Sequence, residues 1–133
     1  MAVVTALKVG DNGIPARFSA ADTMAPRVTL GSTSGTAPTP NIDNEDLFIL
    51  SGLSVNVVFG APTGTPSHGM RLMIRIKDNG TARTIGWNSG TNGYRAVGMI
   101  LPTTTVSSKT IYVGCVYNST DSKWDVIAVV SEQ

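Results

Sequence analysis

Hydrophobic and polar residues alternate with a period of two along several segments, which is the pattern of β-strands. The clearest segment is 71–77, where Leu72, Ile74 and Ile76 share one face and basic residues occupy most of the other. Residues 53–59 repeat the pattern, with an apolar residue at every odd position. No segment has the apolar spacing of a helix over a useful length. The pattern therefore predicts an all-β fold.

Turn signals between these segments predict two antiparallel hairpins. The first joins 71–77 to a return strand at 81–87 through Asp78-Asn79-Gly80, since Asn and Gly tolerate positive φ. The second occupies residues 110–130, with a turn at 118–123 whose Asn and Asp side chains can hydrogen-bond the backbone. The expected fold class is an antiparallel β-sandwich or barrel-like meander.

The N-terminal third has little sustained periodicity. Residues 31–40 consist of Gly, Ser, Thr, Ala and Pro, which predicts a linker or an arm that lies along a partner. Short strands are expected before this stretch, at residues 3–9, 14–19 and 27–30. The sequence therefore divides into an extended N-terminal arm with short strands (1–45) and an antiparallel β-domain (46–133).

Inward-facing positions of the predicted strands define the expected core. Burying one large apolar side chain stabilises a fold by about 1.5–3 kcal/mol. The expected core residues are Leu72, Ile74, Ile76, Ile85, Trp87, Ile111, Val113, Trp124, Val126 and Ala128.

Composition narrows the class of partner. Charged residues make up 14% of the 133 residues, below the roughly 25% of typical soluble domains, and mean hydropathy is +0.11. This indicates buried surface beyond a monomer's own core, the alternative being a low-charge monomer. A net charge of +1 gives no global reason to expect nucleic acid or membrane binding.

The termini and the cysteine content bear on the compartment. The chain contains no apolar run long enough for a membrane span, and its first residues lack the features of a signal peptide. The single Cys115 excludes an intrachain disulfide framework. We therefore expect synthesis in a cytoplasm.

Residues capable of catalysis or metal binding are scarce. His68 is the only histidine, and we interpret it as a solvated loop residue rather than the base of a triad with Ser67. Cys115 lies in an apolar strand and is expected to be a small buried hydrophobe. The acidic stretch 41–46 lacks EF-hand spacing, so it predicts a polar entry to the next strand, with calcium binding as the alternative. We expect no enzyme, cofactor or metal site.

Half of the basic residues lie between positions 71 and 95, and Asp78 is the only acid among them. On one sheet face they would form a positive stripe for an anionic partner surface. The alternative is a solubilising outer face that also blocks unwanted strand addition. The candidate partner-binding residues are Arg71, Arg75, Lys77, Arg83 and Arg95.

Several segments carry a resemblance to known proteins. They read RLMIRIKDNGTARTI (71–85), YR (94–95), LPTTT (101–105), YVGCVYN (112–118) and DSKWDVIAV (121–129), with GIPARFSAADT at 13–23. They resemble a domain of tailed-bacteriophage virion structural proteins, and the N-terminal one resembles a segment of phage fibre and head-associated proteins. Together they cover about two-thirds of the chain. The resemblance implies a virion component made in the bacterial host cytoplasm, and an assembly as a trimer.

The leading functional hypothesis is a capsid decoration (cement) protein that binds and stabilises the shell of major capsid proteins. The first alternative is a tail, baseplate or fibre component, including a receptor-binding tip. A second alternative is a carbohydrate-binding module that uses Trp87, Tyr94 and Trp124 for stacking. A hydrolase comes last.

Overall fold

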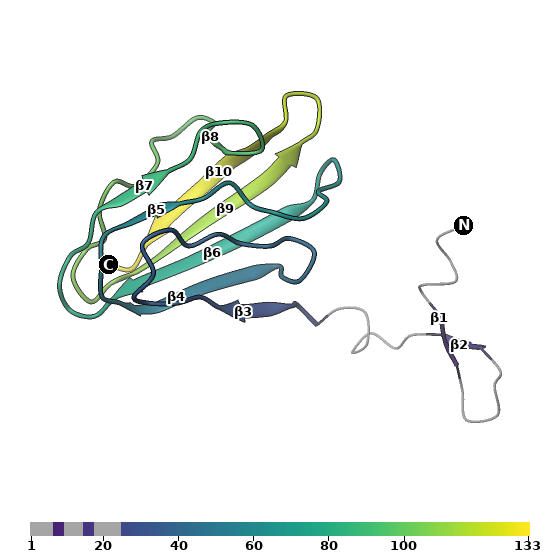
Figure 1. The fold of residues 1–133 in the computed structure, drawn as a ribbon, viewed down its shortest axis with the longest axis horizontal. Coiled ribbons are helices and arrows are strands. Elements are labelled where there is room, and N and C mark those ends of the chain that lie inside the picture. Colours follow the sequence, from purple (N-terminus) through teal and green to yellow (C-terminus); the bar gives the residue numbers. More distant parts are fainter. Residues whose placement is uncertain (1–6, 10–14, 18–24) are drawn as a thin grey trace.

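The computed structural model describes residues 7–9, 15–17 and 25–133 (Figure 1). These residues form β-strands and no helix, which confirms the all-β prediction. The strands are β1 (Leu7–Val9), β2 (Pro15–Arg17), β3 (Val28–Leu30), β4 (Leu47–Leu53), β5 (Val57–Phe59), β6 (Arg71–Asp78), β7 (Ile85–Trp87), β8 (Tyr94–Ala96), β9 (Thr110–Asn118) and β10 (Lys123–Ser131).

A mixed six-stranded sheet dominates the molecule, in the order β3-β4-β6-β9-β10-β8. β3, β4 and β6 are parallel to one another, and β8 is parallel to β10. Only the β6–β9 and β9–β10 pairs within this sheet are antiparallel. The expectation of an antiparallel meander is therefore wrong for three of the five strand pairs of this sheet.

The first predicted hairpin does not form. β6 has the predicted alternation, with every second side chain buried, but its neighbours are β4 and β9. After Gly80 the chain crosses to a second layer, where β7 pairs in parallel with β5. β6 buries more apolar surface between the long strands β4 and β9 than it would beside the three-residue strand β7. This explains why it pairs with β4 and β9.

The chain from β3 to β7 winds like a solenoid. β3, β4 and β6 lie in the large sheet, and each is followed by a stretch that lies in the second layer. Residues 33–40 form the first of these stretches: the Thr36 and Pro38 carbonyls accept hydrogen bonds from Val58 N (2.9 Å) and Gly60 N (3.0 Å) of the β5 region. β5 and β7 form the other two.

The predicted arm at 31–40 therefore packs on this chain's own domain rather than along a partner. Its prolines lie at the edge of the second layer, where a missing N–H costs no ladder bond. Ile42 and Glu45 are buried, so a boundary at residue 45 cuts through the core. β1 and β2, which lie within the strands expected at 3–9 and 14–19, pair antiparallel.

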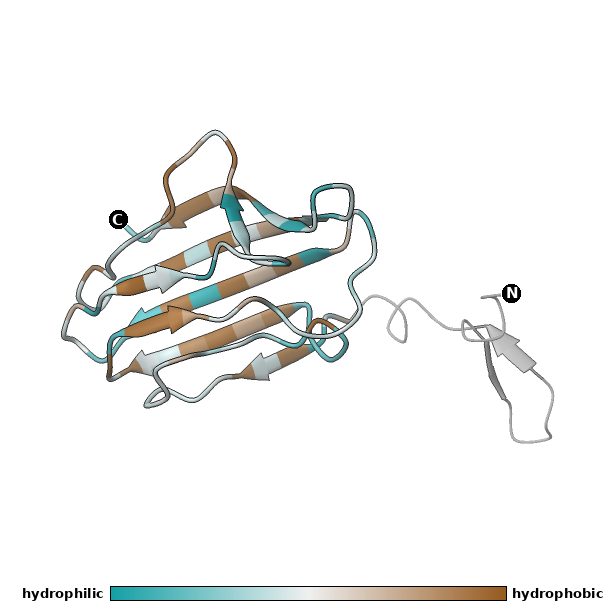
Figure 2. Cartoon of the chain, turned by 45° about the horizontal axis from the view of Figure 1, so that its top comes forward, coloured by the Kyte–Doolittle hydropathy of each residue, from teal (hydrophilic) through white to brown (hydrophobic). Residues whose placement is uncertain are grey.

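The core lies between the two layers, and Phe59 of β5 stands at its centre. Phe59 is fully buried, stacks on Trp87 with ring centroids 4.6 Å apart, and meets Phe48 and Tyr94 edge-on at 6.4 Å. Figure 2 shows the alternation of hydrophobic and hydrophilic residues along the strands that sorts side chains into this core. Eight of the ten expected core residues are buried.

The two exceptions are Trp87, which is partly buried, and Ala128, which is exposed. Ala128 follows a β-bulge in β10, where the register with β9 shifts between Val126 and Ala128. The extra residue reverses the alternation, so that Val129 packs on the core and Ala128 faces outward. A strict two-residue period cannot predict this reversal.

The second predicted hairpin is confirmed. β9 and β10 are antiparallel, and Lys123 pairs with Asn118 across the turn. The Asn118 Oδ1 accepts hydrogen bonds from the backbone N–H groups of Thr120 (3.0 Å) and Asp121 (3.2 Å). The side chain thus shapes its own turn, as the sequence indicates.

Asp78 holds the crossover from the sheet to the second layer. Its buried carboxylate accepts hydrogen bonds from Thr105 Oγ1 (2.6 Å), Ser108 N (2.8 Å) and Gly80 N (2.9 Å). Burial alone would raise the pKa of Asp78, but these hydrogen bonds outweigh it and the pKa lies below its ordinary value. One ionised carboxylate therefore joins the turn after β6 to residues 105–108.

We expect Phe59→Ala to lower the free energy of unfolding by about 3–5 kcal/mol, because it removes the aromatic centre of the core. Val58→Ala is the matched control: Val58 is adjacent but 57% exposed, so its change should stay within about 0.5 kcal/mol. Urea unfolding of both variants checks this. Equal effects would contradict the two-layer packing.

We expect Asp78→Asn to lower the free energy of unfolding by about 1–3 kcal/mol at neutral pH, because the amide replaces a carboxylate that accepts three hydrogen bonds. The folded pKa is depressed, so this contribution is complete above the unfolded value of about 3.9 and is lost as pH falls through the folded pKa. Urea midpoints measured from pH 7 downward should converge for wild type and variant. A constant difference would refute the assignment.

Candidate functional site

The outer face of the six-stranded sheet, which points away from the second layer, collects the candidate partner-binding residues of β6. Alternation directs Arg71, Arg75 and Lys77 to this face, on one strand. Arg71 and Lys77 are exposed and Arg75 is partly buried. The ion pairs found within the described residues involve Arg27 and Arg95 but none of these three. Three of the five candidates therefore form a cationic row without an ion pair among the described residues. Its Lys77 end lies near Glu132, whose pKa is lowered by the Thr110 backbone N–H and by Lys109 and Lys77.

Arg75 is held in place by an aromatic neighbour. Its guanidinium carbon lies 6.0 Å from the centroid of the Tyr112 ring, directly across the β6–β9 ladder. Its Nη1 also lies 3.4 Å from the Tyr112 hydroxyl, to which it donates. The cation–π contact fixes Arg75 while leaving its charge uncompensated.

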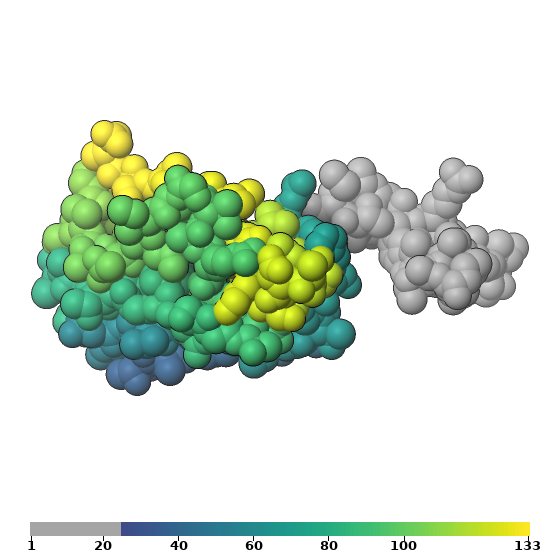
Figure 3. Space-filling model, turned by 90° about the horizontal axis from the view of Figure 1, so that it is seen from above, coloured from purple at the N-terminus to yellow at the C-terminus, as the bar shows by residue number. Residues whose placement is uncertain are grey.

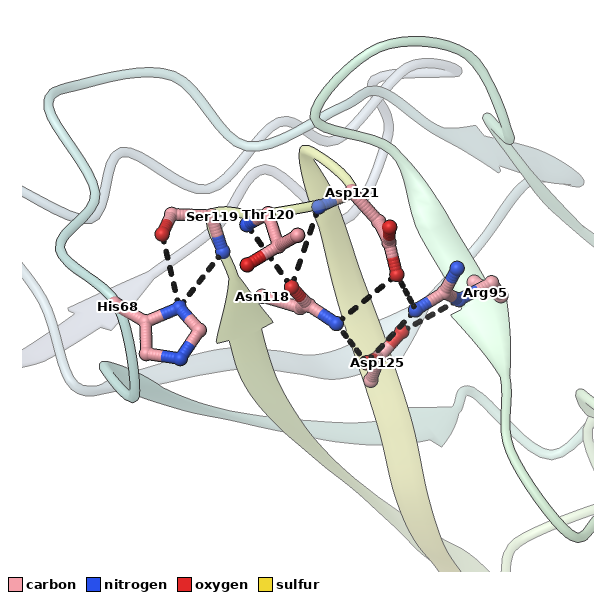
Figure 4. Close-up of polar contacts among 7 residues, drawn as sticks. All are labelled: His68, Arg95, Asn118, Ser119, Thr120, Asp121 and Asp125. Carbon is pink, nitrogen blue, oxygen red and sulfur yellow. Dashed lines mark hydrogen bonds and ion pairs between the residues drawn. The ribbon is translucent and has the colours of Figure 1, made fainter.

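Arg95 lies on β8 and is neutralised within the chain. Its Nε donates to Asp125 Oδ1 at 2.7 Å, and its Nη2 to Asp121 Oδ2 at 3.0 Å (Figure 4). This guanidinium lowers the pKa of the Asp125 carboxyl below its ordinary range, and the two acids raise the pKa of Arg95. Arg95 therefore links the edge strand β8 to the β9–β10 turn. Its charge is neutralised there and does not add to the row on β6.

Arg83 is also apart from the row. It follows the crossover, its Nη2 donates to Asn79 Oδ1 at 3.1 Å, and its carbonyl accepts from Thr105 N at 2.8 Å. The structure thus brings together three of the five predicted residues and separates Arg83 and Arg95 from them.

Apolar side chains surround the cationic row, and sequence reasoning missed this. On neighbouring outward positions lie Val28 and Leu30 of β3, Met73 of β6, and Ile127 and Val130 of β10, with exposures from 40% to 76%. Sheet faces in solution are usually polar, and a contiguous exposed apolar area on a monomer is uncommon. Apolar residues at outward positions of β6 and β10 are the signal that would have revealed it.

The apolar surface continues beyond β8. Val97 is 46% exposed and lies against β10, since its N–H donates to Val126 O at 3.0 Å, and Ile100 is 87% exposed. Figure 3 shows this side of the molecule, with the green segment around β8 between the C-terminal residues and the β9–β10 turn. Apolar contact surface therefore flanks both edges of the sheet.

His68 contacts a serine other than the one considered from the sequence. Its Nδ1 lies 2.9 Å from Ser119 Oγ and accepts the Ser119 backbone N–H at 3.1 Å (Figure 4). No carboxylate in the described part of the chain hydrogen-bonds His68, so the third member of a catalytic triad is not found there. What the contact does is join the loop before β6 to the β9–β10 turn.

The acidic stretch 41–46 is used in local structure. Asp46 pairs with Arg27 at 2.8 Å, Asp43 accepts the Thr65 N–H at 2.9 Å, and buried Glu45 accepts the Asn41 N–H. Within residues 7–9, 15–17 and 25–133 no group of three potential metal ligands occurs. These carboxylates act as the polar entry to β4.

Cys115 and the aromatic candidates lie inside. Burial raises the pKa of the Cys115 thiol to about 12, so the group stays protonated at neutral pH. Trp124 and Tyr94 are buried, and Trp87 is partly buried, with its Nε1 donating to Pro102 O at 2.7 Å. These three aromatics do not form an exposed platform for a sugar.

No helix in the described part is long and apolar enough to cross a membrane.

No protein-family model matches the chain, and no curated protein matches it. Among solved structures, one described as "Structure of a chaperone-substrate complex" is similar, with 14% sequence identity and a TM-score of 0.48 over 93% of this chain. The match covers 20% of that structure's chain, so the present chain spans about one fifth of its length. At this TM-score the similarity carries no argument about function.

We expect Arg95→Gln and Asp125→Asn each to lower the urea midpoint, because the first leaves Asp125 without its cation and the second leaves Arg95 paired with Asp121 alone. The double variant should lose less than the sum of the two, since the second change removes the stranded charge. Replacing Arg71, Arg75 and Lys77 together by Gln should leave the midpoint nearly unchanged. Additive effects of Arg95 and Asp125, or a large loss in the triple variant, would contradict this division of the charges.

Proposed function

We propose that this chain is a non-enzymatic virion structural protein of a tailed bacteriophage, and specifically a capsid decoration (cement) protein. In this proposal it binds the shell of major capsid proteins through the outer face of its six-stranded sheet. The observation that supports the proposal is the combination on that face of exposed apolar residues with the cationic row of Arg71, Arg75 and Lys77.

This combination suits a protein surface as partner. Covering exposed apolar side chains provides about 25 cal/mol for each Å² removed from water. The cations contribute orientation and association rate toward an acidic surface more than they contribute affinity. The opposite side of the sheet is covered by β5 and β7, so docking on the outer face requires no rearrangement of the core.

The residues that hold the fold together are separate from those offered to the partner. Arg27, Arg95 and Asp78 are engaged in ion pairs or hydrogen bonds within the chain, whereas Arg71, Arg75 and Lys77 form no ion pair within the described residues. A decoration protein has to fold before it meets the shell, and this separation allows it. The phage resemblance of the sequence adds a virion location and a trimeric state to the same proposal.

The test is decoration of purified phage heads by the full-length protein, detected by co-sedimentation and by gold labelling in electron micrographs. We expect wild-type protein on heads, with binding reduced about tenfold or more by Val130→Glu, which places a charge among apolar contacts. Val58→Glu is the matched control, because Val58 is equally exposed but lies on the second layer.

Label on tails alone would replace this proposal by the tail, baseplate or fibre alternative. Absence of label from every part of the particle would refute a virion role altogether. Equal loss from Val130→Glu and Val58→Glu would leave the head location standing but exclude the outer face as the docking surface.

A further inference from the structure

A depression interrupts the outer face at its centre. Gly114 of β9 lies between Met73 of β6 and Ala128 of β10, to which it is paired in register. A Cβ added at Gly114 would lie 3.6 Å from both Met73 Cε and Ala128 Cβ, an ordinary contact distance. The absent side chain therefore leaves a hollow, whose rim includes Arg71, Val116 and Ile127. We call this hollow the Gly114 depression.

The backbone does not require a glycine at this position. The φ angle of Gly114 is not positive, and the residue lies within a nine-residue strand. Glycine in a strand interior costs stability through backbone entropy and lost packing, and it often marks the close approach of another group. The backbone conformation therefore does not explain the glycine, and the space that it leaves on the outer face is the feature to be explained.

Charge around the depression is one-sided. Arg71 lies on its rim and Arg75 follows on the same strand, and neither has an ion pair among the described residues, whereas Lys77 at the far end lies near Glu132. On another part of the rim Arg27 and Asp46 neutralise each other at 2.8 Å. An occupant of the depression therefore meets an apolar floor with a positive border.

We propose that the Gly114 depression receives one bulky apolar side chain from a partner protein segment whose flanking residues are Asp or Glu. The apolar side chain packs over Gly114 against Met73, Ala128 and the rim residue Ile127, and the flanking carboxylates meet Arg71 and Arg75. The inference rests on the proposed function only in using the outer face for docking, and it holds for a shell or a tail protein alike.

The charges argue against two other occupants. A second copy placed face to face would bring the row of Arg71, Arg75 and Lys77 close to its own counterpart, and like charges across an interface are costly. A single nucleic acid strand stacks its bases on a series of exposed aromatic faces, whereas the row has one aromatic neighbour, Tyr112, whose ring already contacts Arg75 at 6.0 Å.

The test titrates the ¹⁵N-labelled full-length chain with three synthetic peptides and follows backbone amide shifts. The first peptide has one central tryptophan flanked by Asp and Glu, the second has lysines in place of the acids, and the third has serine in place of tryptophan. We expect the first to shift the amides of Met73, Gly114 and Ala128, and to bind at least about fivefold more tightly than the others.

Gly114→Val is the decisive variant, because its side chain fills the depression while valine suits a strand. We expect an unfolding midpoint no lower than wild type, together with about tenfold or greater loss of binding to the first peptide. Gly114→Ala should give a smaller loss. Val58→Thr, on the second layer, should bind like wild type.

Equal binding of the acidic and lysine peptides, unchanged binding by Gly114→Val, or no shifts at millimolar peptide would overturn the proposal. So would concentration-dependent shifts of the same amides without peptide, which indicate a second copy, or displacement of the acidic peptide by a single-stranded oligonucleotide. Peptide binding without head decoration would refute the proposed function alone, and decoration unaffected by Gly114→Val would refute this inference alone.

Discussion

The packing of Phe59 against Phe48, Trp87 and Tyr94 is the interaction on which the rest of the structure depends. It joins a thin second layer to one face of a large sheet, and so closes the core. Because the second layer consists of short stretches from successive windings, its formation requires β3, β4 and β6 to run in parallel. The mixed sheet is the consequence of covering that one face.

The same constraint leaves the outer face without a cover from the described residues. A six-stranded sheet has two faces, and the second layer covers one of them. The other face would normally present polar residues to solvent, yet Val28, Leu30, Met73, Ile127 and Val130 are exposed there. These exposed apolar residues contribute to the positive mean hydropathy of the sequence.

The charged residues divide into two groups by what they contact. Asp78 and the pair of Arg95 and Asp125 stabilise crossovers and edges within the chain. The row on β6 is predicted from alternation, because a period of two places residues 71, 75 and 77 on one face whatever the strand's partners are. Arg95 could not be sorted in this way, since the acids that neutralise it lie 26 and 30 residues further along the chain.

The sequence by itself determined the features that depend on neighbouring residues. These are the β class, the inward face of β6, and the β9–β10 hairpin with its Asn118 turn, since each is encoded within a few residues. Only the tertiary structure decided which strands pair in parallel, where residues 31–40 lie, and how the bulge after Val126 turns Ala128 outward. Those features depend on contacts between segments far apart in the chain, where the gain from burying the core outweighs a local turn signal such as Asp78-Asn79-Gly80.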